Sequence, residues 1–155
     1  MDFKSLKEKI INFKDNTIDK MANSLAESNF VIRNKEELSD AIEKSKNTIF
    51  VDKKTRKRKT NIKHTIIIFT WKDSDFYKDF LLSFSVMATK AWTQWITLKL
   101  SDMDKEDLQE YDIKEFPSLV LFTNRKLKKV IVWEENIKKI VKSLNFNIIE
   151  KINNF

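Results

Sequence analysis

Side chains that could carry out covalent or redox chemistry are scarce in this sequence of 155 residues. It contains no cysteine, which excludes disulfides, thiolate metal sites and cysteine nucleophiles. His64 is the only histidine, and this argues against zinc and haem sites and against a Ser-His mechanism. There is also no glycine, whereas Walker and Rossmann nucleotide-binding loops require it. We therefore expect no metal, no cofactor and no catalytic residues, and the protein is predicted not to be an enzyme.

Positive charge is the strongest chemical signal, and one segment carries the excess. The net charge is +7. Seven basic residues lie within positions 53–63, with no acid among them: Lys53, Lys54, Arg56, Lys57, Arg58, Lys59 and Lys63. Such a cluster can neutralise phosphates, which predicts a nucleic-acid partner and binding that weakens with salt. The alternative is a solvated hairpin tip whose charge keeps a strand edge from pairing.

Hydrophobic periodicity predicts the elements that position these residues. Apolar residues at three- and four-residue steps indicate an amphipathic helix over residues 2–28. It forms an N-terminal extension, residues 1–29, to a domain spanning residues 30–155. Short apolar runs predict strands at 30–32, 48–51, 65–71, 92–100, 119–122 and 127–133. Helices are predicted after Asn34, from Ser74 to about Lys90, over 105–111 and from Glu134 to Leu144.

One run around the only proline resembles a known family. Residues Tyr111 to Ser118, followed by the apolar run 119–122, are similar to the Tyr-x-Ile-x-x-x-Pro-Thr run of thioredoxins, in which proline opens a strand. Pro117 falls on that position. The resemblance covers residues 65–144 and extends more loosely back to Phe30. It implies an α/β, three-layer thioredoxin-like fold with a central mixed sheet flanked by helices, a basic hairpin or loop added, and a cis peptide bond before Pro117.

The redox residues of that family are missing. Aligning residues 69–78 with the family's active-site turn places Ser74 and Tyr77 at the two cysteine positions. Asp73 then replaces the customary tryptophan, and Ile68 replaces the buried acid that assists proton transfer. A serine hydroxyl is a poor nucleophile without a base. The resemblance therefore implies a thioredoxin-like domain without dithiol oxidoreductase activity.

The face that holds the active site in thioredoxins is nevertheless a candidate binding surface. In the family, the backbone beside the cis-proline pairs with an extended peptide, a form of strand addition that needs no thiol. We therefore predict a protein or peptide partner, bound by these residues: Trp71, Ser74, Phe76, Tyr77, Phe116, Pro117 and Ser118. The alternative is that Ser74 only caps a helix, and that Phe76 and Tyr77 pack in the core.

The N-terminal extension also has two alternatives. Its apolar face can pack on its own domain or against a partner helix in a dimer. Acidic residues accompany its lysines, which argues against binding at a membrane surface. Apolar runs such as residues 66–69 are far shorter than the roughly 20 residues that span a membrane, and the first residues lack an apolar signal segment. We expect no membrane association and a cytoplasmic location.

Overall fold

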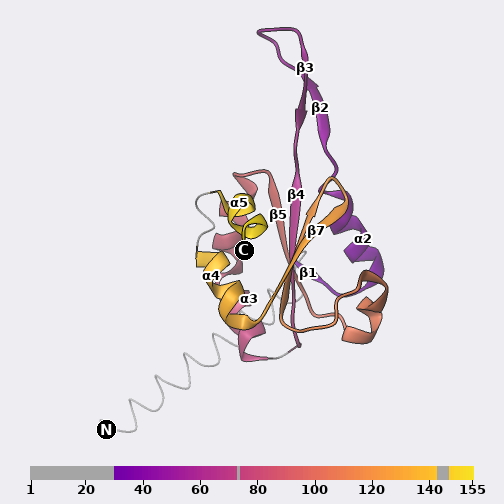
Figure 1. The fold of residues 1–155 in the computed structure, drawn as a ribbon, viewed down its shortest axis with the longest axis vertical. Coiled ribbons are helices and arrows are strands. Elements are labelled where there is room, and N and C mark those ends of the chain that lie inside the picture. The colour runs from indigo at the N-terminus through magenta and orange to yellow at the C-terminus, as the bar shows by residue number, and fades with distance from the viewer. Residues whose placement is uncertain (1–29, 73, 143–146) are drawn as a thin grey trace, which may run out of the picture.

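A five-stranded sheet in the order β1-β5-β4-β6-β7 forms the centre of the molecule (Figure 1). The structure is a computed structural model, and it describes residues 30–72, 74–142 and 147–155. The predicted N-terminal extension, Asp73 and Leu144 lie outside the described residues. The elements in chain order are β1 (Val31–Ile32), α2 (Lys35–Glu43), β2 (Thr48–Val51), β3 (Arg58–Asn61), β4 (His64–Phe69), α3 (Asp75–Trp92), β5 (Ile96–Ser101), the 3-10 helix η1 (Lys105–Tyr111), β6 (Ser118–Thr123), β7 (Lys126–Val132), α4 (Glu134–Lys142) and α5 (Ile148–Asn153).

The strand directions confirm the thioredoxin-like fold. Strands β1 and β4 both run parallel to β5. Strand β6 runs antiparallel to β4, and β7 runs antiparallel to β6. From β4 on, the order is a strand–helix–strand unit, the short helix η1, the β6–β7 hairpin and the helix α4, as the resemblance implied, and α5 follows. One two-stranded hairpin, β2–β3, is inserted between α2 and β4.

Strand β4 separates two hydrophobic layers, because side chains alternate between the faces of a strand. Ile66 and Ile68 point into the core shared with α3, α4 and α5. Ile67 and Phe69 point into the second core, under α2 and η1. The prediction of a central strand covered on both faces is confirmed (Figure 1). Among the described residues, no helix is long and apolar enough to span a bilayer.

Both predicted helix caps are present, but some boundaries differ from the prediction. The Asn34 side chain accepts a hydrogen bond from the backbone of Glu37 at 2.8 Å, and Ser74 accepts one from Tyr77 at 3.1 Å. Helix α3 continues to Trp92, so the prediction of a strand beginning there is wrong. Residues 93–95 form the turn that ends this helix, and β5 begins only at Ile96. Helix α5 was not predicted.

The turns of this glycine-free chain use other residue types in left-handed conformations. Seven described residues have positive φ: Arg56, Trp95, Asp112, Asn124, Arg125, Trp133 and Asn147. Each lies in a turn, at a strand end or at a helix boundary. Asn124 and Arg125 form the tight turn between β6 and β7, where glycine is the usual residue. The turns of this fold therefore form without glycine, the residue that adopts positive φ most readily.

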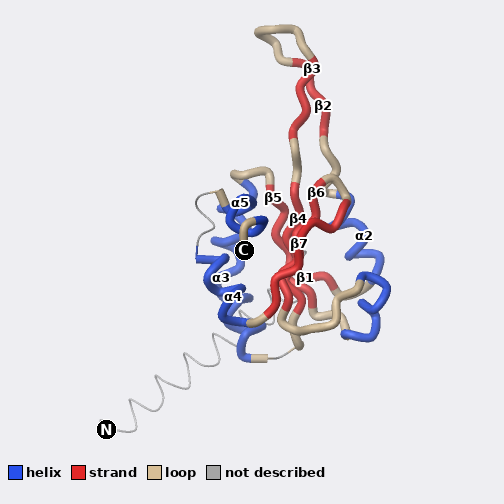
Figure 2. Tube along the Cα trace, viewed as in Figure 1, coloured by secondary structure: helices blue, strands red, loops and turns tan. Residues whose placement is uncertain are grey.

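The inserted hairpin projects away from the sheet (Figures 1 and 2). Strands β2 and β3 pair from Thr48 opposite Asn61 to Val51 opposite Arg58. At its base, the Asn47 side chain accepts a hydrogen bond from the backbone of Lys63 at 3.2 Å, and the Asn47 backbone donates one to Asn124 at 3.1 Å. The β6–β7 turn therefore holds the base of the hairpin. The basic hairpin is confirmed, but its second strand, β3, lies within the basic segment and was not predicted.

Candidate functional site

The C-terminal end of β4 and the start of β6 bring two aromatic residues together. Phe69 lies opposite Ser118 in the β4–β6 pairing, so the residues after Phe69 lie beside those before Ser118. The Trp71 ring packs edge-on against the Phe116 ring, with 4.9 Å between centroids and 66° between the planes. The Phe116–Pro117 peptide bond is cis, as the resemblance implied. These residues form one continuous face, which we call the Trp71 face: Trp71, Phe116 and Pro117.

The Trp71 face is accessible. Trp71 is 53% exposed, and Phe116 and Pro117 are half-buried. Within the described part of the chain, the backbone N–H and C=O of Phe116 have no hydrogen-bond partner. Ser118 is buried, and its hydroxyl donates to the carbonyl of Glu115. Of the last three predicted binding residues, Phe116 and Pro117 are therefore available to a partner, whereas the Ser118 side chain is not.

Phe76 and Tyr77 do not lie on this face, which corrects the prediction that they contact a partner. Their exposed fractions are 6% and 2%. Ser74 begins α3 as its N-cap, and the next turn then directs both rings toward the sheet, alongside Phe80 and Phe84 at helical spacing. The alternative, capping by Ser74 and packing by Phe76 and Tyr77, is the arrangement that the structure has.

A pocket of about 780 Å³ adjoins the exposed tryptophan. Its walls come from Trp71, from Lys105 and Gln109 of η1, and from Ile113 and Lys114 in the segment that leads to Phe116. The Lys105 ammonium lies 5.9 Å from the centroid of the Trp71 ring, within the range of a cation–π contact. Sequence reasoning missed this pocket, because it depends on how η1 packs beside β4. In the sequence, the only local sign of this site was the tryptophan at position 71, which was predicted to bind a partner.

The carboxyl group of Asp102, the residue that follows β5, is partly buried. Burial raises its pKa above the ordinary value of 3.8, while the positive charges of Lys72 and Arg33 act in the opposite direction. The Tyr77 hydroxyl donates to Asp102 Oδ2 over a long 3.5 Å. No group of three or more metal-ligating side chains exists among the described residues. The arrangement provides hydrogen bonds and apolar contacts rather than a nucleophile with its base.

The partly buried carboxyl group of Asp102 gives a testable pH dependence. An acid with a raised folded-state pKa binds its proton more tightly in the folded protein, so it lowers stability as the pH rises above the ordinary value. We expect Asp102→Asn to raise the melting temperature at about pH 7, with a smaller gain at about pH 3. Circular-dichroism melts at both pH values would measure this, with the exposed Asp40→Asn as the control. A gain that is equal at both pH values would contradict the assignment.

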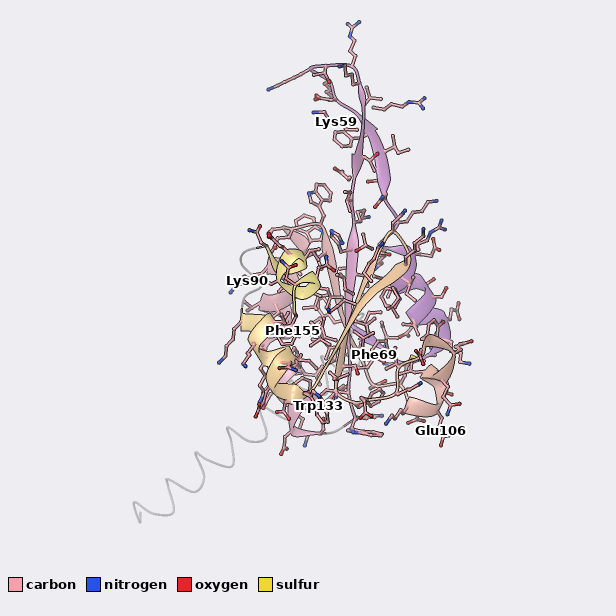
Figure 3. All side chains as sticks on the ribbon, in the orientation of Figure 1. Lys59, Phe69, Lys90, Glu106, Trp133 and Phe155 are labelled. Atoms are coloured by element: carbon pink, nitrogen blue, oxygen red, sulfur yellow. The ribbon has the colours of Figure 1, made fainter. Side chains whose placement is uncertain are left out.

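The seven predicted phosphate-binding residues gather on the β2–β3 hairpin. Lys53, Lys54, Arg56 and Lys57 form the tip, Arg58 and Lys59 lie on β3, and Lys63 follows at the base. Within the described residues, only Lys59 of the seven forms an ion pair, with Asp52 Oδ2 at 2.8 Å. This contact holds the pKa of Asp52 below its ordinary value. The hairpin and the Trp71 face lie at opposite ends of the molecule, as the labels Lys59 and Glu106 show in Figure 3.

This chain resembles known proteins in fold only. No family model and no curated protein matches its sequence. A crystal structure of a designed protein superposes with a TM-score of 0.50 at 18% identity, covering 74% of this chain and 92% of that one. The oxidised thioredoxin of Plasmodium falciparum gives 0.49 at 8% identity, with 73% and 94% covered. Thioredoxin from Fasciola hepatica gives 0.48 at 11% identity, with 73% and 96% covered.

Proposed function

We propose that this protein is a redox-inactive, thioredoxin-like domain that binds an extended segment of a protein partner at the Trp71 face. The observation that carries the proposal is the backbone of Phe116, whose N–H and C=O are unpaired within the described residues, beside a half-exposed tryptophan. An accessible residue with both groups unpaired can receive an added strand. The absence of cysteine does not affect this binding, because it uses main-chain hydrogen bonds.

The side chains around Phe116 supply the contacts that strand addition alone lacks. Each main-chain hydrogen bond contributes only about 0.5–1.5 kcal/mol net, so specificity requires pockets for side chains. Trp71 offers an exposed aromatic surface, and tryptophan is among the residues that most often dominate binding energy. The adjoining pocket of about 780 Å³ is large enough for partner side chains. Lys105 and Glu106 at its rim can pair with either sign of charge.

Among the residues that the structure describes, those on and around the Trp71 face do not include a nucleophile paired with a base. The Ser74 hydroxyl accepts the capping hydrogen bond from Tyr77, and no histidine lies near it, because His64 is at the other end of β4. The position that holds an acid in thioredoxins is Ile68, which is fully buried. A bound peptide would therefore be held without being oxidised, reduced or cleaved.

A displayed library of random peptides tests this proposal, followed by affinity measurements with a synthetic version of the enriched peptide. We expect Trp71→Ala to weaken binding at least about tenfold, as loss of a binding hot spot does. Trp92→Ala is the matched control, since Trp92 is exposed on a different surface at the end of α3. In ¹⁵N-labelled protein, the amide signal of Phe116 should shift when the peptide binds. Equal affinity for Trp71→Ala, or an unmoved Phe116 signal, would refute the proposal.

A further inference from the structure

The β2–β3 hairpin exposes side chains that its own domain does not use. Ile49 is 69% exposed and Val51 is 60% exposed, although β-branched residues in strands normally pack against a core. Neither belongs to either hydrophobic core. Six cations accompany them without an ion pair among the described residues. This combination of apolar and basic surface is directed outward from the fold (Figure 3).

The register of the hairpin sorts these side chains onto two faces. Cross-strand partners share a face, and alternate residues change face. Ile49 lies opposite Thr60, and Val51 lies opposite Arg58, so these four residues form one face. The other face carries Thr48, Phe50, Lys59 and Asn61. The first face thus joins two aliphatic side chains with a hydroxyl group and a guanidinium group.

Hydrogen bonds fix the tip that carries the largest density of charge. The backbone of Arg56 donates to the carbonyl of Asp52 at 2.7 Å, and the backbone of Asp52 donates to that of Lys57 at 3.0 Å. The Asp52 side chain also accepts from the backbone of Lys54 at 3.0 Å. An ordered tip presents its cations at set positions, so less conformational entropy is lost when they bind a ligand.

We infer that this hairpin is an arm that binds duplex DNA, with its Ile49–Val51 face toward the bases of the major groove and its tip cations on the phosphates. The major groove of B-form DNA is about 12 Å wide and admits a two-stranded ribbon. Aliphatic side chains and threonine contact the thymine methyl group there, and arginine pairs with guanine. These are the residue types that the first face provides.

The geometry disfavours RNA as the ligand. The major groove of an RNA helix is deep and too narrow for side chains to read. Binding of single strands relies on aromatic stacking, and the only aromatic residue on the hairpin is Phe50, on the face opposite Ile49 and Val51. The inference does not rest on the proposed peptide binding, because the arm and the Trp71 face lie at opposite ends of β4.

Fluorescence anisotropy with a labelled DNA duplex of about 20 base pairs, titrated with the full-length protein, tests the inference. If the four tip cations contact phosphates, the dissociation constant should rise about 10²-fold between about 50 and 200 mM salt. The triple substitution Lys53→Gln, Lys54→Gln and Lys57→Gln should reduce the slope of log K against log salt by about 2.7, or 0.9 for each contact. The matched control replaces three exposed lysines of the helices: Lys90→Gln, Lys142→Gln and Lys151→Gln.

The remaining measurements distinguish DNA from other anionic ligands. Ile49→Ser with Val51→Ser should weaken DNA binding and leave the salt slope unchanged, because it removes the methyl groups that contact thymine and changes no charge. An RNA duplex of the same sequence and poly-glutamate should each bind more weakly than the DNA duplex. Equal or tighter binding of RNA or poly-glutamate would overturn the inference, as would equal salt slopes for the hairpin and control triples. Absence of DNA binding at low salt would also overturn it.

Discussion

Tyr77→Ala is expected to lower the free energy of unfolding by about 3–5 kcal/mol, the usual cost of truncating a buried aromatic side chain. Among the described residues, Tyr77 is one of the largest fully buried side chains, and it packs in the core between α3 and the sheet. The neighbouring residues are held by the sheet and by α4, so they cannot collapse into the space that the ring leaves. Urea denaturation followed by circular dichroism would measure the change.

Two further substitutions separate packing from other effects. Tyr77→Phe keeps the ring and removes the hydroxyl that donates to Asp102 over 3.5 Å, so we expect the free energy of unfolding to fall by no more than about 1 kcal/mol. Val86 lies on the exposed side of the same helix, so we expect Val86→Ala to change the free energy of unfolding by no more than about 0.5 kcal/mol. A stable Tyr77→Ala protein that lost peptide binding would restore the original prediction that Tyr77 contacts a partner.

Removal of the arm is expected to abolish DNA binding and leave the domain folded. Replacing residues 49–60 with the dipeptide Asn-Gly joins Thr48 to Asn61, whose Cα atoms are already paired across the hairpin. The deleted residues belong to neither core. The hydrogen bonds of Asn47 at the base remain. We expect the free energy of unfolding to change by less than about 1 kcal/mol, since a shorter loop alters closure entropy only slightly.

The same deletion is informative for the Trp71 face. A peptide that binds the intact protein should bind the deletion variant equally well, because the two surfaces share no residue. Denaturant melts and anisotropy with the DNA duplex would give stability and binding on one sample. A deletion variant that fails to fold, or that binds DNA as tightly as the intact protein, would contradict the separation of arm and domain.

Local patterns in the sequence were sufficient to predict the central elements of the fold. The apolar run of β4 predicted burial on both faces, because only a strand between two helical layers buries every residue. Asn34 and Ser74 predicted helix starts, because their side chains satisfy backbone donors within three residues. Pro117 marked the start of β6 through its resemblance to a family motif. Each of these signals lies within a few positions of the feature that it predicts.

The misplaced features depend on contacts between distant segments. Helix α3 has apolar residues on its exposed side as well, including Leu82 and Val86, so periodicity did not show which side faces the core. Trp92 and Trp95 favour strands by type, yet both are exposed at the end of a helix. The pocket beside Trp71 forms where η1 and the segment before Phe116 lie next to this side chain in the folded protein. These segments are far from Trp71 in the sequence, so no local sequence pattern predicts the pocket.

The left-handed turns have a consequence for how this protein can change through mutation. A residue with a Cβ atom held in the left-handed region costs roughly 1–2 kcal/mol. Four of the seven such positions, Arg56, Trp95, Arg125 and Trp133, carry long or bulky side chains rather than the more tolerant asparagine or aspartate. Domains have only about 5–15 kcal/mol of net stability. A codon change to glycine weakens most helices and strands, but at these turns it would relieve backbone strain. The stabilising mutations that these turns favour therefore introduce a residue type that the sequence does not contain.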